Sequence, residues 1–242
     1  MLILAFDTTS EHGGVALYRD SECLALARST EAATYSVTLF QMVGRLFEEV
    51  RTKEAGTRLS LRDIGLFAVA NGPGSFTGIR VGLAAAQAWA KAFGRPVWAV
   101  SILEAMVEQA RPETDLAVPI LDARRNEFYL GTFRRVPAEA HSQFVAADHG
   151  LVLRAEALDR LLGEYLRSGA AVSCLVREYD QRARGLRQAL PESLRWADVP
   201  DTLLPAIARL ALEAHQQGRV QSPAKLDAFY IRRSDAELNW KG

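Results

Sequence analysis

The residues best suited to chemistry lie directly after the first apolar run of the sequence. Asp7, Thr8 and Thr9 follow the run Leu2 to Phe6 and come shortly before a pair of glycines. A carboxylate can orient hydrated Mg²⁺, and hydroxyl groups with backbone N–H groups can bind phosphate oxygens. These three residues are therefore candidates for nucleotide binding. The structural alternative is a turn, because Asp and Thr also form turns.

A second candidate is the glycine-rich segment NGPGSFTGIRVGL at residues 71–83. It lacks the lysine of a P-loop, and its first three glycines do not have the spacing of a dinucleotide fingerprint. An anion could still bind at the N-terminus of the helix that follows. Gly78 and Gly82, however, lie on one face of that helix, where close approach of a backbone or side chain explains a glycine pair better.

No nucleophile and no set of metal ligands is recognisable in the sequence. Ser75 lies in GPGSFTG, but the nucleophile elbow requires glycine where Thr77 stands. A helix N-cap explains Ser75 better. The histidines lack the spacing of metal ligands; they are His12, His141, His149 and His215. We therefore expect no catalytic residue and no metal in this chain.

Apolar patterns predict the elements that would hold these segments. Continuous apolar runs predict strands at residues 2–6, 15–18, 23–27, 66–70 and 97–100. Helical periodicity and stop signals predict helices at 36–51, 76–93, 155–167 and 202–217, with a loop at 136–150. Strands that alternate with crossover helices indicate an α/β fold. The strand, turn and strand around Asp122 repeat those around Asp7, which suggests a duplicated unit.

The two helices of the amino-terminal half have broad apolar faces. In the helix at 76–93 the polar side chains occupy roughly 80° of arc, at ~100° per residue; they are Thr77, Arg80, Gln87 and Lys91. In the helix at 36–51 the apolar side chains span roughly 160°; they are Leu39, Phe40, Met42, Val43, Leu46, Phe47 and Val50. A sheet face needs a stripe of only about 100°. Either the two helices bury the excess against each other, or another protein's helices cover it.

Composition excludes several classes of protein. Lysine plus arginine equals aspartate plus glutamate at 29 each, so no bulk positive charge attracts nucleic acid or a membrane. Cys23 and Cys174 are far apart and match neither a disulfide framework nor a zinc motif, which suits a reducing compartment. The first apolar run is too short for a signal peptide or a membrane span. We expect a cytoplasmic protein with no membrane partner.

Four segments, in this order, resemble the bacterial TsaB family, also called YeaZ: LAFDTTSEHGGVAL, AVANGPGSFTGIRVGLAAAQAWA, PVWAVSILEAM and LDARRNEFY. The resemblance covers residues 1–133, and the tail FYIRR is similar to a family ending. It implies an α/β fold of the actin, sugar-kinase and Hsp70 class, with two lobes built from duplicated ribonuclease-H-like units. We expect lobes at residues 1–103 and 104–225, and a tail at 226–242 that joins the first lobe.

The resemblance also implies a function. Members are noncatalytic partners of TsaD, which transfers a threonylcarbamoyl group to the adenosine next to the anticodon in tRNAs that read codons beginning with A. TsaE is a further partner, tRNA is bound indirectly through the complex, and ATP and Mg²⁺ belong to the partner subunits, with no cofactor in the isolated chain. A homodimer is expected when the chain is alone. The alternatives are a small phosphotransferase that uses Asp7, Thr8 and Thr9 on ATP, or a homodimeric scaffold.

The resemblance places the surface for TsaD, or for a second copy, on the helices at 36–51 and 76–93. Its expected residues are Tyr35, Ser36, Leu39, Phe40, Val43, Phe47, Phe76, Ile79, Arg80, Leu83 and Gln87. The sequence departs from the family where Tyr35 replaces a histidine before Ser36 and where Gln41 replaces a proline. Contacts at these positions therefore need not be those of the family.

Two groups of charged residues keep alternative interpretations. Asp122, Arg124 and Arg125 either form a polar cluster that contacts a partner or belong to the turn of a hairpin. Arg232 and Arg233 either contact TsaD, TsaE or the tRNA backbone, or lie in a solvated tail.

Overall fold

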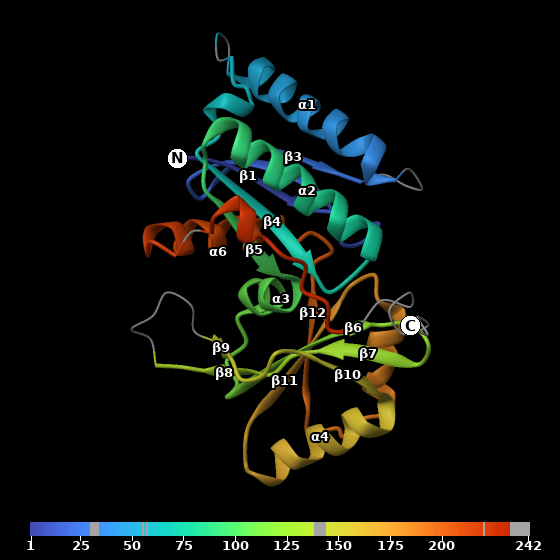
Figure 1. The fold of residues 1–242 in the computed structure, drawn as a ribbon. Coiled ribbons are helices and arrows are strands. Elements are labelled where there is room, and N and C mark those ends of the chain that lie inside the picture. Colours follow the sequence, from blue (N-terminus) through green and yellow to red (C-terminus); the bar gives the residue numbers. More distant parts are fainter. Residues whose placement is uncertain (30–33, 55, 57, 138–143, 220, 233–242) are drawn as a thin grey trace, which may run out of the picture. The chain divides into compact units, whose positions relative to one another are not determined.

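The computed structural model describes residues 1–29, 34–54, 56, 58–137, 144–219 and 221–232 of the 242-residue chain. The chain forms two compact units and passes between them more than once. The first unit contains Met1–Ile102 and Thr202–Phe229, and the second contains Leu103–Asp201 and the residues from Tyr230 onward. Each unit has a sheet of its own (Figure 1).

A five-stranded sheet forms the centre of the first unit. Its strands are β1 (Leu2–Asp7), β2 (Gly14–Arg19), β3 (Glu22–Arg28), β4 (Leu66–Gly72) and β5 (Val97–Ser101). The order is β3-β2-β1-β4-β5, with an antiparallel β1-β2-β3 part and with β4 and β5 parallel to β1. Phe6 of the central strand lies between Val15 of β2 and Val69 of β4. This central position explains why β1 is a continuous apolar run, since both its faces are buried.

Helices cover both faces of the first sheet (Figure 1). On one face lie α1 (Tyr35–Lys53) and α2 (Phe76–Phe93), and on the other lies α6 (Leu204–Gln216). Leu4 and Phe6 pack with α1 and α2, whereas Ile3 and Ala5 alternate with them and point to the opposite face. The 3₁₀ turn η1 (Leu61–Asp63) precedes β4.

Local signals set both ends of α2. The Ser75 side chain accepts a hydrogen bond from the Gly78 N–H at 3.3 Å, which caps the N-terminus. Gly94 ends the helix in the left-handed conformation, with φ of 61°. The predicted helix at 76–93 and the capping role of Ser75 are confirmed.

The segment at residues 221–229, which we call the carboxy-terminal strap, runs back along the first unit. It includes the 3₁₀ turn η3 (Pro223–Lys225). Gln87 of α2 donates to the Leu226 carbonyl at 3.1 Å, and the Phe229 N–H donates to the Asn71 carbonyl at 2.9 Å. Leu226 is buried and belongs to the same core as α2, so the strap covers part of that helix.

The second unit repeats the architecture of the first. Its main strands are β6 (Leu116–Asp122), β7 (Glu127–Leu130), β10 (Leu151–Arg154), β11 (Val172–Arg177) and β12 (Arg195–Val199). The order is β10-β7-β6-β11-β12, again antiparallel on one side of the central strand and parallel on the other. A side hairpin pairs β8 (Phe133–Arg135) with β9 (Phe144–Ala146). The helical elements are α3 (Ile102–Ala110), α4 (Ala155–Arg167), α5 (Gln181–Gly185) and η2 (Leu186–Gln188).

The two sheets share one strand order and one set of strand directions, so the predicted α/β fold with a duplicated unit is confirmed. Three expectations differ from the structure. The tail expected to join the first lobe does so only up to Phe229, and Tyr230–Arg232 belong to the second unit. The loop expected at 136–150 contains β9, because Phe133 pairs with Ala146. The helix expected at 202–217 lies in the first unit and not in the second, because its apolar face completes the first sheet. Residues 233–242 of the expected tail lie outside the described residues.

Candidate functional site

The glycine-rich segment packs against the loop that follows β1. A Cβ atom at Gly78 would overlap the carbonyl oxygen of Thr8, and one at Gly74 would overlap that of Thr9. The Ser75 N–H donates to the Thr9 carbonyl at 2.6 Å, and the Thr8 hydroxyl donates to the Gly78 carbonyl at 2.7 Å. The glycines therefore allow two backbone segments to touch, as the sequence predicted for Gly78.

Asp7, Thr8 and Thr9 are committed to internal hydrogen bonds. Their exposed fractions are 1%, 0% and 4%. The Asp7 Oδ1 atom accepts from the Thr9 N–H at 2.8 Å and from the Thr9 hydroxyl at 2.6 Å. The Oδ2 atom is buried and has no hydrogen-bond partner among the described residues. The predicted phosphate-binding role would require this loop to separate from α2 first, because neither hydroxyl faces an open site.

The expected partner-binding residues do not form one exposed surface. Five of them belong to the core of the first unit: Tyr35, Leu39, Val43, Ile79 and Leu83. Two are half-buried, Phe47 and Gln87, and four are exposed, Ser36, Phe40, Phe76 and Arg80. The five buried residues cannot contact a partner directly, because the helices bury most of their apolar excess against the sheet, each other and the strap. A charge at Val43 or Leu83 would disrupt the core and would not test an interface.

Tyr35 illustrates this internal role. Its hydroxyl donates to the Ser10 carbonyl at 2.7 Å, and a Cβ atom at Gly13 would lie 2.6 Å from the same hydroxyl. Tyr35 therefore fastens the first turn of α1 to the loop after β1.

An exposed apolar area nevertheless remains on α1. We call it the α1 surface and define it as Val37, Phe40, Gly44 and Phe47. The side chains of Val37 and Phe40 are 60% and 59% exposed. Beside them lies an open groove of about 420 Å³ whose apolar lining includes Phe40, Phe47, Leu59, Leu61, Trp89 and Phe93. The Phe40 ring meets the ring of Trp89 edge to face, with centroids 5.5 Å apart.

No contact within the first unit requires a glycine at position 44. It lies in the middle of α1, lines the groove, and a Cβ atom there would have no neighbour within 4 Å. A glycine in a helix interior costs about 1 kcal/mol relative to alanine. No close approach inside the first unit offsets this cost, in contrast to Gly78.

At the start of α2, Phe76 and Arg80 form a second small exposed feature. The Arg80 guanidinium carbon lies 3.8 Å from the centroid of the Phe76 ring, and Phe76 is 39% exposed. An arginine stacked on an aromatic ring presents a charge and an apolar face together.

The described residues hold neither a cluster of metal ligands nor a membrane-spanning helix. Within the described ranges, no three or more His, Cys, Asp and Glu side chains gather in a way that could hold a metal ion. His141 lies outside those ranges. Among the helices described, none combines the length and the apolar character needed to cross a bilayer.

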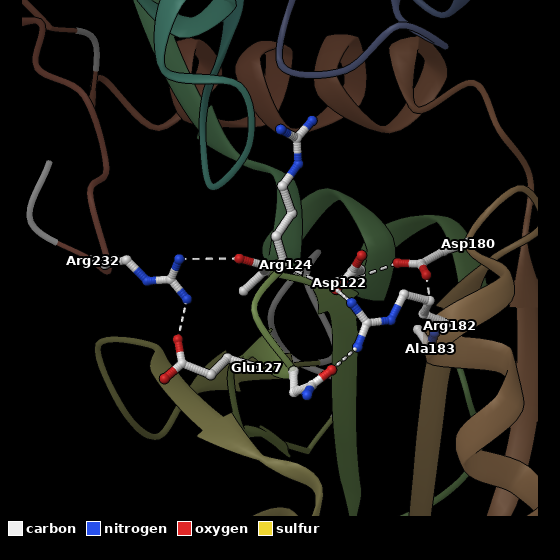
Figure 2. Close-up of polar contacts among 9 residues, drawn as sticks. Asp122, Arg124, Glu127, Asp180, Arg182, Ala183 and Arg232 are labelled. Atoms are coloured by element: carbon white, nitrogen blue, oxygen red, sulfur yellow. Dashed lines mark hydrogen bonds and ion pairs between the residues drawn. The ribbon is translucent and has the colours of Figure 1, made fainter. Parts of the chain in front are cut away.

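Asp122, Arg124 and Arg125 lie in the hairpin turn between β6 and β7, which is one of the two alternatives, and a polar cluster surrounds this turn (Figure 2). Asp122 accepts from the Arg124 N–H at 2.9 Å and pairs with Arg182 of α5 at 3.3 Å. Asp180 caps α5 through the Ala183 N–H at 2.9 Å and also accepts from the Asp122 N–H at 2.7 Å. Sequence reasoning identified Asp122 and Arg124 but missed Asp180 and Arg182, which come from a distant segment.

The carboxy-terminal residues contact the same turn. Arg232 donates to the Ala123 carbonyl at 3.1 Å and forms an ion pair with Glu127. Arg232 is therefore bound within the second unit and is not a free solvated side chain. Arg233 lies outside the described residues.

Comparison with known proteins gives a consistent set of relatives. Residues 31–167 match the family model described as TsaD: tRNA N6-adenosine threonylcarbamoyltransferase. The tRNA threonylcarbamoyladenosine biosynthesis protein TsaB of Bacillus subtilis (strain 168) is 33% identical over 134 residues, 55% of this chain and 56% of that protein. The protein of the same name from Escherichia coli (strain K12) is 32% identical over 137 residues, 56% of each chain. The matches thus span about half the length of these curated relatives.

Solved structures extend the likeness to both units. YeaZ from Pseudomonas aeruginosa superposes with a TM-score of 0.68 at 23% identity, covering 95% of this chain and 99% of that chain. A second structure from the same organism, described as similar to peptidase YEAZ, has a TM-score of 0.73 at 22% identity and covers 96% and 99%. At this level of identity the likeness concerns the fold, and the expected two-lobe fold class is confirmed.

Proposed function

Because the chain belongs to the TsaB (YeaZ) family of tRNA threonylcarbamoyladenosine biosynthesis proteins, we propose that it is a noncatalytic subunit that binds TsaD. The observation that carries the proposal is the exposed Phe40 beside the open groove of the α1 surface. TsaD supplies the transfer chemistry, TsaE completes the complex in the cytoplasm, and tRNA reaches this chain through its partners. ATP and Mg²⁺ belong to those partners.

The α1 surface offers enough apolar area to matter for binding. Complete burial of a side chain such as Phe or Val stabilises by about 1.5–3 kcal/mol. Phe40 and Val37 are 59% and 60% exposed, so a partner that covers both removes more than half of each from water. This corresponds to about 2–3 kcal/mol in total, the size of an interface hot spot. The contact with Trp89 already restricts the Phe40 ring, so little side-chain freedom is lost on binding.

The noncatalytic role is supported by the loop after β1. The side chains most suited to phosphate chemistry, Asp7, Thr8 and Thr9, are buried and bonded to one another or to α2. Helix α1 carries no histidine, whereas TsaD is expected to hold its metal through a histidine pair on the corresponding helix. We therefore assign the reaction to TsaD and a supporting role to this chain.

The test is complex formation with TsaD, measured by calorimetry on the full chain. We expect Phe40→Glu and Val37→Glu each to weaken binding by at least about tenfold, because each buries a charge in an apolar contact. Val145→Glu is the matched control, since Val145 is 54% exposed on β9 of the second unit. Unchanged affinity in both α1 variants, or an equal loss in the control, contradicts the proposed interface.

Two alternatives have distinct outcomes. Self-association through the α1 surface predicts a dimer that Phe40→Glu dissociates in sedimentation, and TsaD should then displace the second copy. A dimer that TsaD joins without displacing either copy contradicts the assignment of this surface to TsaD. Hydrolysis or transfer of the ATP γ-phosphate by the purified chain contradicts the noncatalytic role and favours the phosphotransferase.

A further inference from the structure

The thiol of Cys23 is exposed at the edge of the first sheet. Cys23 lies in β3, the edge strand next to β2. Its thiol donates weakly to the Ala25 carbonyl, with 3.7 Å between sulfur and oxygen, and this leaves the sulfur lone pairs for another donor. The other cysteine, Cys174, is 0% exposed. An oxidant in solution therefore reaches Cys23 but not Cys174 in the folded protein.

A bulge places Tyr18 of β2 directly opposite Cys23. Leu17 pairs with Ala25 and Tyr18 pairs with Cys23, so Leu24 is an extra residue on β3 at this point. Residues that face each other across antiparallel strands have side chains on the same face of the sheet, with Cβ atoms about 4.5–5.5 Å apart. The side chains of Tyr18 and Cys23 are therefore neighbours at the sheet edge.

The Tyr18 hydroxyl is a buried donor that lacks an acceptor. Tyr18 is 4% exposed, and its hydroxyl makes no hydrogen bond to the described part of the chain. Burial raises the pKa of Tyr18, the adjacent Cys23 thiol raises it further, and Arg209 of α6 opposes this with a smaller effect. The hydroxyl thus keeps its proton and lies beside the thiol. Because a buried hydroxyl without a partner destabilises the folded state, an acceptor attached to the Cys23 sulfur would be stabilising.

From this pair we propose that Cys23 is a site of reversible oxidation by hydrogen peroxide, at which the Tyr18 hydroxyl stabilises a sulfenic acid. The Cys23 thiolate attacks one oxygen of the peroxide, so that the S–O bond forms as the O–O bond breaks. The sulfur is oxidised, and the leaving hydroxide takes the electron pair and a proton to become water. The new oxygen lies one bond beyond the sulfur, where the Tyr18 hydroxyl donates to it.

The surroundings of Cys23 favour a persistent sulfenic acid. Such an acid is normally lost by condensation with a second thiol or by further oxidation. Cys174 is buried in the core of the second unit and cannot supply that thiol. A hydrogen bond from Tyr18 withdraws electron density from the sulfenic group and slows further oxidation. A small thiol in solution restores Cys23 by forming a mixed disulfide with release of water, which a second thiol then cleaves.

The experiment exposes the purified full chain to hydrogen peroxide, traps sulfenic acid with dimedone and locates the adduct by mass spectrometry. We expect an adduct at Cys23 and none at Cys174, and dithiothreitol added before dimedone should prevent it. Adding dimedone after increasing delays measures the lifetime of the sulfenic acid. Tyr18→Phe should shorten this lifetime by about fivefold, the factor that one hydrogen bond contributes.

Two variants control for other effects of the substitutions. Tyr165→Phe is matched to Tyr18→Phe, because it removes a tyrosine hydroxyl that bonds Thr132 in the second unit. It should leave the lifetime at Cys23 unchanged. Cys23→Ser should give no adduct in the folded protein.

Thermal unfolding gives a readout that does not depend on any variant. Oxidation should raise the Tm of the wild type, because the Tyr18 hydroxyl gains an acceptor, and it should not raise the Tm of Tyr18→Phe. Any of four results overturns the proposal: no adduct at Cys23, an equal lifetime in Tyr18→Phe, an equal shortening in Tyr165→Phe, or a lower Tm after oxidation. A disulfide-linked dimer as the main product also overturns it, because Tyr18 would then not protect the sulfenic acid.

Discussion

Gly44 and Gly78 both lie inside long helices, yet alanine at these two positions should have opposite effects on stability. In a helix interior, alanine is favoured over glycine by about 1 kcal/mol. At Gly44 a Cβ atom has no neighbour within 4 Å, so the full helical gain should be realised. We expect Gly44→Ala to raise the free energy of unfolding by about 0.5–1 kcal/mol.

At Gly78 the same substitution meets the backbone of the loop after β1. The new Cβ would overlap the Thr8 carbonyl oxygen. This loop cannot move away cheaply, because the Thr8 hydroxyl is bonded to the Gly78 carbonyl and the Thr9 carbonyl to the Ser75 N–H. Overpacking of this kind costs about 1–3 kcal/mol or more. Because the overlap is with backbone, the cost lies at the upper end of this range, at about 2–3 kcal/mol. After the helical gain of about 1 kcal/mol is subtracted, we expect Gly78→Ala to lower the free energy of unfolding by about 1–2 kcal/mol.

Urea and thermal unfolding followed by circular dichroism measure both effects. A change of 1 kcal/mol shifts Tm by about 2–4 °C for a chain of this size. A Gly78→Ala protein as stable as the wild type would refute the close-packing explanation of the glycine segment. A destabilised Gly44→Ala protein would refute the open character of the α1 surface. If TsaD approaches α1 at Gly44, the added methyl group should hinder binding. Gly44→Ala should then weaken the complex with TsaD severalfold, although it stabilises the free chain.

Two further predictions concern the second unit. Asp180→Ala removes a buried acceptor from two backbone N–H groups and should cost about 2–4 kcal/mol in urea unfolding, whereas Asp159→Ala on the exposed side of α4 should cost less than about 0.5 kcal/mol. Burial raises the pKa of Cys174 from 9.0 to about 12, so the folded state keeps the neutral thiol. The contribution of the neutral thiol to the free energy of unfolding is complete below the pKa of the unfolded state. It is lost as the pH rises from 9 toward 12, and about 1 kcal/mol is lost by pH 10. Wild type should therefore lose more stability between pH 8 and 10 than Cys174→Ala, and equal slopes would contradict this.

Elements with local start and stop signals could be predicted from the sequence. The bounds of α2 were predicted to the residue, because Ser75 and Gly94 mark its ends by chemistry that acts within one turn. Strands β11 and β12 were missed, because β11 is defined by pairing with β6, a distant segment, and β12 by pairing with β11. Helix α6 was predicted, but nothing in its own residues indicates which sheet it covers.

The prediction of interface residues was limited in the same way, because local sequence does not indicate long-range contacts. A helical wheel counts apolar residues but does not show what covers them, so Val43 and Leu83 were expected at an interface and lie in the core. The carboxy-terminal strap covers part of α2, and no periodic pattern in the sequence indicates this contact. At the β6–β7 turn, Asp122 and Arg124 could be selected from the local pattern. Asp180 and Arg182 could not, because only the folded sheet brings α5 to that turn.

The position of α6 affects how this protein is made. The amino-terminal sheet needs residues 204–216 to cover one of its faces, and the ribosome synthesises them only after residues 103–201 of the second unit. Until then the nascent chain holds a sheet with an uncovered apolar side that includes Ile3 and Ala5. Native folding of this lobe can therefore be completed only after residues 103–201 have been synthesised. A gene fragment that stops at residue 103 should yield aggregated protein, whereas one that appends 202–229 through a flexible linker should yield a folded lobe.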